Sequence, residues 1–182
     1  MKVVIKGQID PSVVSDCSHV TGEIQALKGL IEAIDLDVTL RKTTQQIQKQ
    51  LNPQLEIMGW ILNFTYDSNT ISGSPSANYH LNAIKDLPDG KCGHRHRLLL
   101  ELCFDNRQAI GTNLLKFETA KRIFEKNPDC QTNSIILCGS QEALTSLKWD
   151  GGVASFSEYE NSLLTVYKDI FTFSPCYLII QS

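Results

Sequence analysis

Residues 95–106 read RHRLLLELCFDN, an apolar run of strand length that carries one carboxylate near its end. Successive side chains of a strand point to opposite faces, so Glu101 and Cys103 are expected to share one face. A lone glutamate among leucines is unusual, because a buried charge needs a partner or a metal ion. The polar residues 105–107 then open a loop before an expected helix. This stretch therefore singles out Glu101 as the first candidate functional residue.

Two hypotheses account for Glu101. In the first, a carboxylate at a strand end beside a polar loop binds a divalent metal ion on an α/β scaffold, as in a metal-dependent nuclease. In the second, Glu101 lies partly exposed on an edge strand and has no chemical role. The periodicity of the residues alone favours the second, and motifs elsewhere in the chain have to decide between them.

Composition is ordinary for a globular protein: 182 residues, 42% hydrophobic and 20% charged, with a formal net charge of −3. This length predicts one domain, residues 1–182, with a real core. The net charge does not indicate nucleic-acid binding, so a DNA-binding face would have to be a local basic patch. No run approaches the roughly 20 apolar residues of a membrane span, and residues 1–7 are too short for a secretory signal. We expect a cytoplasmic protein whose six scattered cysteines, with no Cys-x-x-Cys pair, stay reduced.

Helical and strand patterns mix along the chain, with helices early and strands clustered later. A helix over 23–34 is expected to begin at Thr21, one over 157–168 to begin at Ser157, and one over 44–58 to break near Pro53. The other expected elements are helices over 113–126 and 141–148 and strands over 3–9, 61–66, 79–84, 97–104, 134–138 and 176–181. This order predicts an α/β or α+β protein with a mixed sheet.

Three stretches, in the right order, resemble one family. They are residues 18–35 with Met58-Gly59-Trp60 after them, residues 98–104 (LLLELCF), and residues 151–167 with their Gly-rich start. The chain resembles the BglII and BstYI type of type II restriction endonucleases, within the PD-(D/E)xK nuclease superfamily. The resemblance implies an α/β fold with a restriction-endonuclease-like mixed sheet flanked by helices.

The chemistry that this resemblance implies is Mg²⁺-assisted hydrolysis of a phosphodiester, with an Asp and the strand Glu as metal ligands. Glu101 matches the strand Glu. Cys103 stands where the family has Lys or Gln, and a thiol orients water poorly and is a soft ligand. Asn82 or Ala83 falls where the first Asp is expected, and Asp86 or Asp89 could replace it if the hairpin register shifts. The candidate metal ligands are thus Glu101 and Asp86.

Candidate DNA contacts follow from the same resemblance and from charge. Asn106 and Arg107 lie just past the Glu101 strand, where the family presents polar residues to DNA, and an Asn can pair with adenine. Lys91, His94 and Arg95 belong to the most basic patch of the chain and could contact phosphates. The alternatives are an ordinary turn at Asn106 and a solvated hairpin tip at the basic patch. Double-stranded DNA is the expected partner, and a homodimer is expected because a palindromic site mirrors a two-fold protein.

The basic patch also contains Cys92, His94 and His96, which could form half of a zinc site. Their spacing is not a standard one, and no further ligand is evident from the sequence.

Charged residues cluster on the helix that follows the Glu101 strand: Lys116, Lys121 and Arg122 with Glu118 and Glu125. Alternating charges on a helix usually mark a solvated face, and we expect one here.

The expected function is Mg²⁺-dependent cleavage of a short DNA site by a type II restriction endonuclease, within a restriction-modification system. An alternative is a catalytically inactive DNA-binding or regulatory protein with the same fold, which Asn82, Ala83 and Cys103 favour. A third possibility is a structural protein that shares only the fold, which the negative net charge would suit.

Overall fold

The computed structural model describes residues 1–7, 17–40, 42–65, 80–88, 95–149 and 151–181. Its centre is a six-stranded mixed sheet in the order β1-β6-β5-β4-β3-β2. The strands are β1 (Lys2–Lys6), β2 (Ile61–Thr65), β3 (His80–Leu87), β4 (Arg95–Leu102), β5 (Cys130–Gly139) and β6 (Cys176–Gln181). Strands β4, β5 and β6 run parallel, whereas β2, β3 and β4 form an antiparallel meander and β1 pairs antiparallel with β6.

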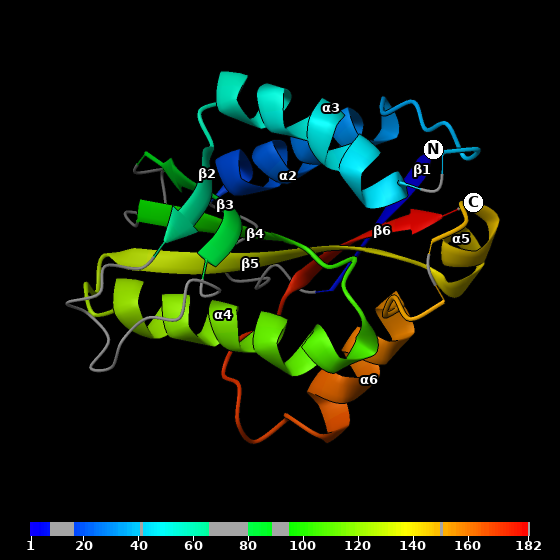
Figure 1. Ribbon diagram of the computed structural model, residues 1–182. Coiled ribbons are helices and arrows are strands. Elements are labelled where there is room, and N and C mark those ends of the chain that lie inside the picture. The colour runs from blue at the N-terminus through cyan, green and yellow to red at the C-terminus, as the bar shows by residue number, and fades with distance from the viewer. Residues whose placement is uncertain (8–16, 41, 66–79, 89–94, 150, 182) are drawn as a thin grey trace.

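Helices cover both faces of this sheet (Figure 1). One face carries α2 (Ser18–Glu32) and α3 (Thr43–Ile57), and the other carries α4 (Ile110–Phe124) and α6 (Phe156–Thr165). A single 3-10 turn, η1 (Arg107–Ala109), leads into α4, and the short α5 (Gln141–Ser146) follows β5. The mixed sheet flanked by helices confirms the α/β prediction.

Strand β4 lies inside the sheet between β5 and β3, and its apolar residues serve both layers. Leu98 and Leu100 pack toward α2 and α3, whereas Leu99 packs toward α4. This double burial explains the nearly continuous leucine run, because a central strand has no solvent face. The hypothesis that Glu101 lies on an exposed edge strand is therefore wrong: its side chain is 2% exposed.

Several helices differ in extent from the expected ones, and three of the differences have a local cause. Helix α2 begins one turn earlier, with Cys17 rather than Thr21 at its N-cap. Helix α6 begins after Ser155 rather than Ser157, because Ser155 and Glu158 form a reciprocal capping box. Helix α3 continues through Pro53, since the buried stripe of Ile47, Leu51 and Leu55 holds both sides of the proline against the sheet layer.

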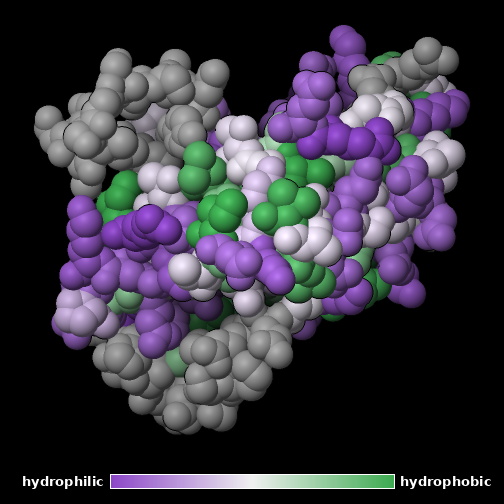
Figure 2. All heavy atoms as spheres, turned by 90° about the horizontal axis from the view of Figure 1, so that it is seen from below, coloured by the Kyte–Doolittle hydropathy of each residue, from purple (hydrophilic) through white to green (hydrophobic). Residues whose placement is uncertain are grey.

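The surface over α4 and α6 mixes residue types: hydrophobic areas lie between hydrophilic ones (Figure 2). Leu115, Leu164 and Ile170 are among its exposed hydrophobic side chains. Within the described residues, no helix is long and apolar enough to cross a membrane.

Candidate functional site

The antiparallel register of β3 and β4 places Asn82 opposite Glu101, one step beyond the Ala83–Leu100 pair. Each of these two side chains bonds the backbone of the opposite strand. The backbone N–H of Asn82 donates to Glu101 Oε2 at 2.9 Å, and Asn82 Oδ1 accepts from the backbone N–H of Leu102 at 2.7 Å. Of the two positions at which a catalytic Asp was expected, position 82 therefore holds an amide that lies beside Glu101.

A lysine from α4 completes this centre. Lys116 Nζ forms an ion pair with Glu101 Oε1, and the two side chains are 10% and 2% exposed. Burial raises the pKa of the Glu101 carboxyl, while the Lys116 charge and hydrogen bond and the Asn82 N–H oppose that rise. Both oxygens of the carboxylate thus have a partner inside the protein.

Cys103 lies next to this pair, beside the buried side chains of Asn113 and Tyr159. Asn113 Nδ2 donates to Tyr159 Oη at 2.9 Å and lies 3.2 Å from Asp105 Oδ2. The Cys103 side chain is fully buried, and burial raises the pKa of its thiol well above the ordinary value despite a hydrogen bond with Tyr159. A neutral thiol in this setting stabilises the contact between β4 and α6 and does not supply a base.

The other predicted carboxylate lies at the far end of the hairpin. Asp86 is four positions along β3 from Asn82, about 13 Å at 3.3 Å per residue. It pairs through both oxygens with Arg97, which also stacks over the Phe124 ring at 4.1 Å from its centroid. The structure therefore does not bring Asp86 and Glu101 together as a ligand pair.

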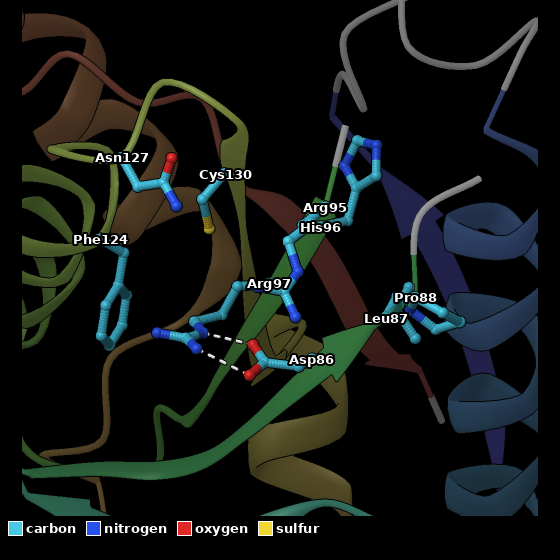
Figure 3. Close-up of a pocket in the computed structure, with 9 residues that line it drawn as sticks. All are labelled: Asp86, Leu87, Pro88, Arg95, His96, Arg97, Phe124, Asn127 and Cys130. Atoms are coloured by element: carbon cyan, nitrogen blue, oxygen red, sulfur yellow. Dashed lines mark hydrogen bonds and ion pairs between the residues drawn. The ribbon is translucent and has the colours of Figure 1, made fainter. Parts of the chain in front are cut away.

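This Asp86–Arg97 pair lies in a separate pocket of about 390 Å³ (Figure 3). Arg95, His96 and Phe124 line it as well. The pocket is thus lined by residues 95–97, the described part of the basic patch. Asp89, Lys91 and His94 lie outside the described residues.

The predicted DNA contacts after β4 already have intramolecular partners. Asn106 caps η1 by accepting from the backbone N–H of Gln108 at 3.0 Å. Arg107 pairs with Glu158 of α6 and donates through Nη1 to the carbonyl of Gly151 at 2.8 Å. These contacts fix the Gly-rich loop against the end of β4. Arg95, at the opposite end of β4, is exposed and does not lie near them.

Two of the charged residues of α4 do not lie on the solvated face that the sequence predicted, whereas Arg122 is exposed as expected. Lys116 and Glu118 are both buried, and the inner face of the helix also carries Asn113, Phe117 and Ala120. The i, i+3, i+4, i+7 spacing of a face that packs on a sheet is that of Asn113, Lys116, Phe117 and Ala120. That spacing was the available signal for Lys116, which sequence reasoning missed because Lys is rarely buried without a partner.

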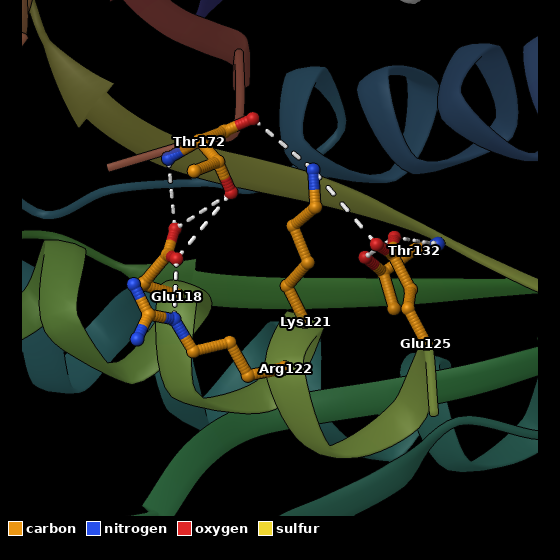
Figure 4. Close-up of polar contacts among 6 residues, drawn as sticks. All are labelled: Glu118, Lys121, Arg122, Glu125, Thr132 and Thr172. Atoms are coloured by element: carbon orange, nitrogen blue, oxygen red, sulfur yellow. Dashed lines mark hydrogen bonds and ion pairs between the residues drawn. The ribbon is translucent and has the colours of Figure 1, made fainter. Parts of the chain in front are cut away.

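Glu118 anchors the segment before β6 to α4 (Figure 4). Its carboxylate accepts from the backbone N–H of Thr172 at 2.9 Å and from Arg122 Nε at 2.7 Å. Burial would raise the pKa of Glu118, but these hydrogen bonds and that of the Thr172 hydroxyl together lower it. Glu118 therefore stabilises the fold above its ordinary pKa, and this contribution is lost as the pH falls through the lowered folded value.

We expect Glu118→Gln to reduce the free energy of unfolding by about 1–3 kcal/mol at neutral pH, because a charged acceptor is replaced by a neutral one. The loss should shrink as the pH falls through the lowered folded-state pKa of Glu118, because the wild-type carboxyl then becomes neutral too. Urea unfolding at several pH values measures this, with Glu56→Gln on the exposed face of α3 as the control. An equal loss at pH 3 and pH 7 would contradict the assignment.

The Glu101 centre, formed by Glu101, Asn82 and Lys116, can hold Mg²⁺ only if it offers free oxygen ligands. Mg²⁺ prefers oxygen ligands in octahedral geometry. The centre offers one carboxylate, which Lys116 already holds, and one amide oxygen, which already accepts from Leu102. Across the described residues, no group of three or more His, Cys, Asp or Glu side chains is placed, as it stands, to hold a metal ion. The residues of the Glu101 centre, arranged in this way, do not fit Mg²⁺.

Among solved structures, the chain is similar to the crystal structure of restriction endonuclease BglII complexed with a DNA 16-mer. The TM-score is 0.58 at 13% sequence identity, over 100% of this chain and 78% of that one. No protein-family model and no curated protein matches the sequence. The likeness shows a restriction-endonuclease-like fold, as the resemblance of the three stretches implied.

Proposed function

We propose that this protein binds double-stranded DNA with a restriction-endonuclease-like fold and does not cleave it. The absence of cleavage is proposed because of the Glu101 centre, where a lysine and an asparagine bind both carboxylate oxygens. The binding of DNA is supported by the fold, because the solved structure of BglII, to which this fold is similar, was determined with DNA. In such a role, the ion pair keeps β4 attached to α4 and takes no part in chemistry.

The polar loops at the end of β4 are the part of this fold that we propose to face DNA. Asn106 and Arg107 are exposed there, and Arg107 forms an ion pair with Glu158. An exposed guanidinium can exchange this partner for a phosphate, since surface ion pairs contribute little. We further propose a homodimer in the DNA complex, so that two copies of this loop would meet a symmetric site.

The test is DNA binding measured by fluorescence anisotropy over a range of salt concentrations, with cleavage assayed in parallel in Mg²⁺ and Mn²⁺. We expect binding that weakens linearly in log–log form as salt rises. Arg107→Ala should lower the affinity and reduce the salt slope by about one, because one phosphate contact is lost. Lys49→Ala, on the exposed side of α3, serves as the control. No binding at low salt would overturn the proposal.

The second candidate function is Mg²⁺-dependent cleavage of DNA. The convergence of Glu101, Asn82 and Lys116 at one strand end favours it, because this is the place that the family resemblance assigns to catalysis. Cleavage by the wild type that disappears in Glu101→Gln, with binding retained, would establish this second function and exclude the first.

A further inference from the structure

The pocket around Arg97 lies at the opposite end of β4 from the loops that we propose to face DNA. Its volume of about 390 Å³ falls in the range of small-molecule sites, about 300–1,000 Å³. Its walls come from the end of β3, the start of β4, the end of α4 and the turn that joins α4 to β5 (Figure 3). Arg97 and Leu102 are five positions apart on β4, about 16 Å. The pocket is therefore a site separate from those loops.

Arg97 is held in one orientation in the wall of this pocket. Its Nε and Nη2 donate to the two carboxylate oxygens of Asp86, and its guanidinium stacks on the Phe124 ring. Its Nη1 forms no hydrogen bond with any residue that the structure describes. Asp86 and Phe124 thus fix the guanidinium and leave one charged donor available to a ligand.

Asn127 provides a second oriented donor. Its Oδ1 accepts from the backbone N–H of Asp129 at 3.0 Å, and its Nδ2 has no hydrogen-bond partner within the described ranges. In Figure 3 the amide nitrogen points toward the Arg97 side of the pocket. The turn itself is fixed, because the backbone N–H of Cys130 donates to the carbonyl of Asn127 at 3.0 Å. Both donors are therefore in place as the structure stands, without any rearrangement.

The pocket carries an excess of positive charge. Among the described residues that line it, Arg95 and Arg97 are the arginines and Asp86 is the carboxylate, whose two oxygens Arg97 already binds. Burial raises the pKa of the Cys130 thiol, so this side chain is neutral and does not repel an anion. Charge and hydrogen-bond donors thus both favour an anionic ligand over a neutral or cationic one.

We propose that this pocket binds a small phosphate monoester. A phosphate group brings negative charge and three strong acceptor oxygens, which suit a guanidinium N–H and an amide N–H that both lack an acceptor. The volume leaves room for an organic group beside the phosphate, and Leu87 and Pro88 give that group an apolar wall. The site does not depend on the proposed DNA binding.

The experiment is calorimetric titration of the full chain at low salt with ribose 5-phosphate, and with ribose and inorganic phosphate for comparison. We expect one equivalent of ribose 5-phosphate to bind, inorganic phosphate to bind more weakly, and ribose not to bind. Asn127→Asp should weaken binding by about tenfold or more, because it keeps the acceptor for the Asp129 N–H but replaces the donor by a charged oxygen. Asn161→Asp, on the exposed side of α6, makes the same change of charge away from the pocket and is the matched control.

Thermal unfolding provides a second measurement, and competition with DNA identifies the source of the phosphate. Ribose 5-phosphate should raise the Tm of the wild type and of Asn161→Asp more than that of Asn127→Asp or Arg97→Gln, and a short DNA duplex should not displace it. The proposal is overturned if the wild type does not bind ribose 5-phosphate, or if Asn127→Asp binds it as tightly as the wild type. It is also overturned if ribose, inorganic phosphate or the duplex occupies the pocket at least as tightly.

Discussion

Replacing Lys116 by methionine is expected to lower the free energy of unfolding by about 3–5 kcal/mol, because it leaves the Glu101 carboxylate buried without its counter-charge. Methionine keeps most of the side-chain volume, so a cavity adds little to the loss. The measurement is urea unfolding at neutral pH, followed by circular dichroism.

The dependence of this loss on pH separates charge from packing. The folded-state pKa of Glu101 is already raised by burial, and removing Lys116 raises it further. A raised folded pKa costs stability as the pH rises through the unfolded value, so the loss should be small near pH 4 and largest near pH 8. The double variant Glu101→Gln with Lys116→Met should recover most of the stability, because a neutral amide still accepts from the Asn82 N–H. A loss that is constant with pH would show that packing, and not the ion pair, is responsible.

Phe117→Ala is expected to cost about 3–5 kcal/mol, because it empties a fully buried position between α4 and the sheet. The Phe117 ring contacts that of Phe173 at 5.6 Å between centroids, so the segment before β6 loses a partner too. Differential scanning calorimetry measures the shift in Tm.

The same helix supplies the control for Phe117. Leu115 is 37% exposed on the outer side of α4, and Leu115→Ala should change the stability by less than about 1 kcal/mol. Comparable losses for the two variants would contradict the packing of α4 described here.

The sheet was predictable where its residues are buried on both sides. The final strand was predicted with its observed bounds, 176–181, since CYLIIQ has no polar residue before its end. Strand β3, which pairs with the Glu101 strand, was predicted to end too early. It continues through Asp86 and Leu87, which belong in sequence to a segment rich in turn residues. There the cross-strand pair of Asp86 with Arg97 stabilises strand geometry that local preference does not favour.

The candidate site was predictable only in its first residue. Glu101 stood out because a carboxylate in a leucine run needs a partner, but the partner comes from α4, fifteen residues later. The buried side chains of Cys17 and His96 are also in contact although they lie 79 residues apart, and a contact of that kind leaves no periodic trace in the sequence. Asn82 was found through the family resemblance and not through its own pattern.

The amide of Asn82 helps to explain why Glu101 can be buried at this strand end without a metal ion. An aspartate there would place two carboxylates side by side at a buried strand end, and their repulsion would raise the pKa of one or both. Nuclease sites accept that cost because a cation relieves it. This chain instead carries an asparagine, which forms the same backbone bond to Leu102 without a charge. Asn82→Asp would therefore lower the free energy of unfolding and raise the affinity of the site for a cation. A change of one side-chain nitrogen to oxygen thus separates a strand end that is stable without a metal ion from one that needs it.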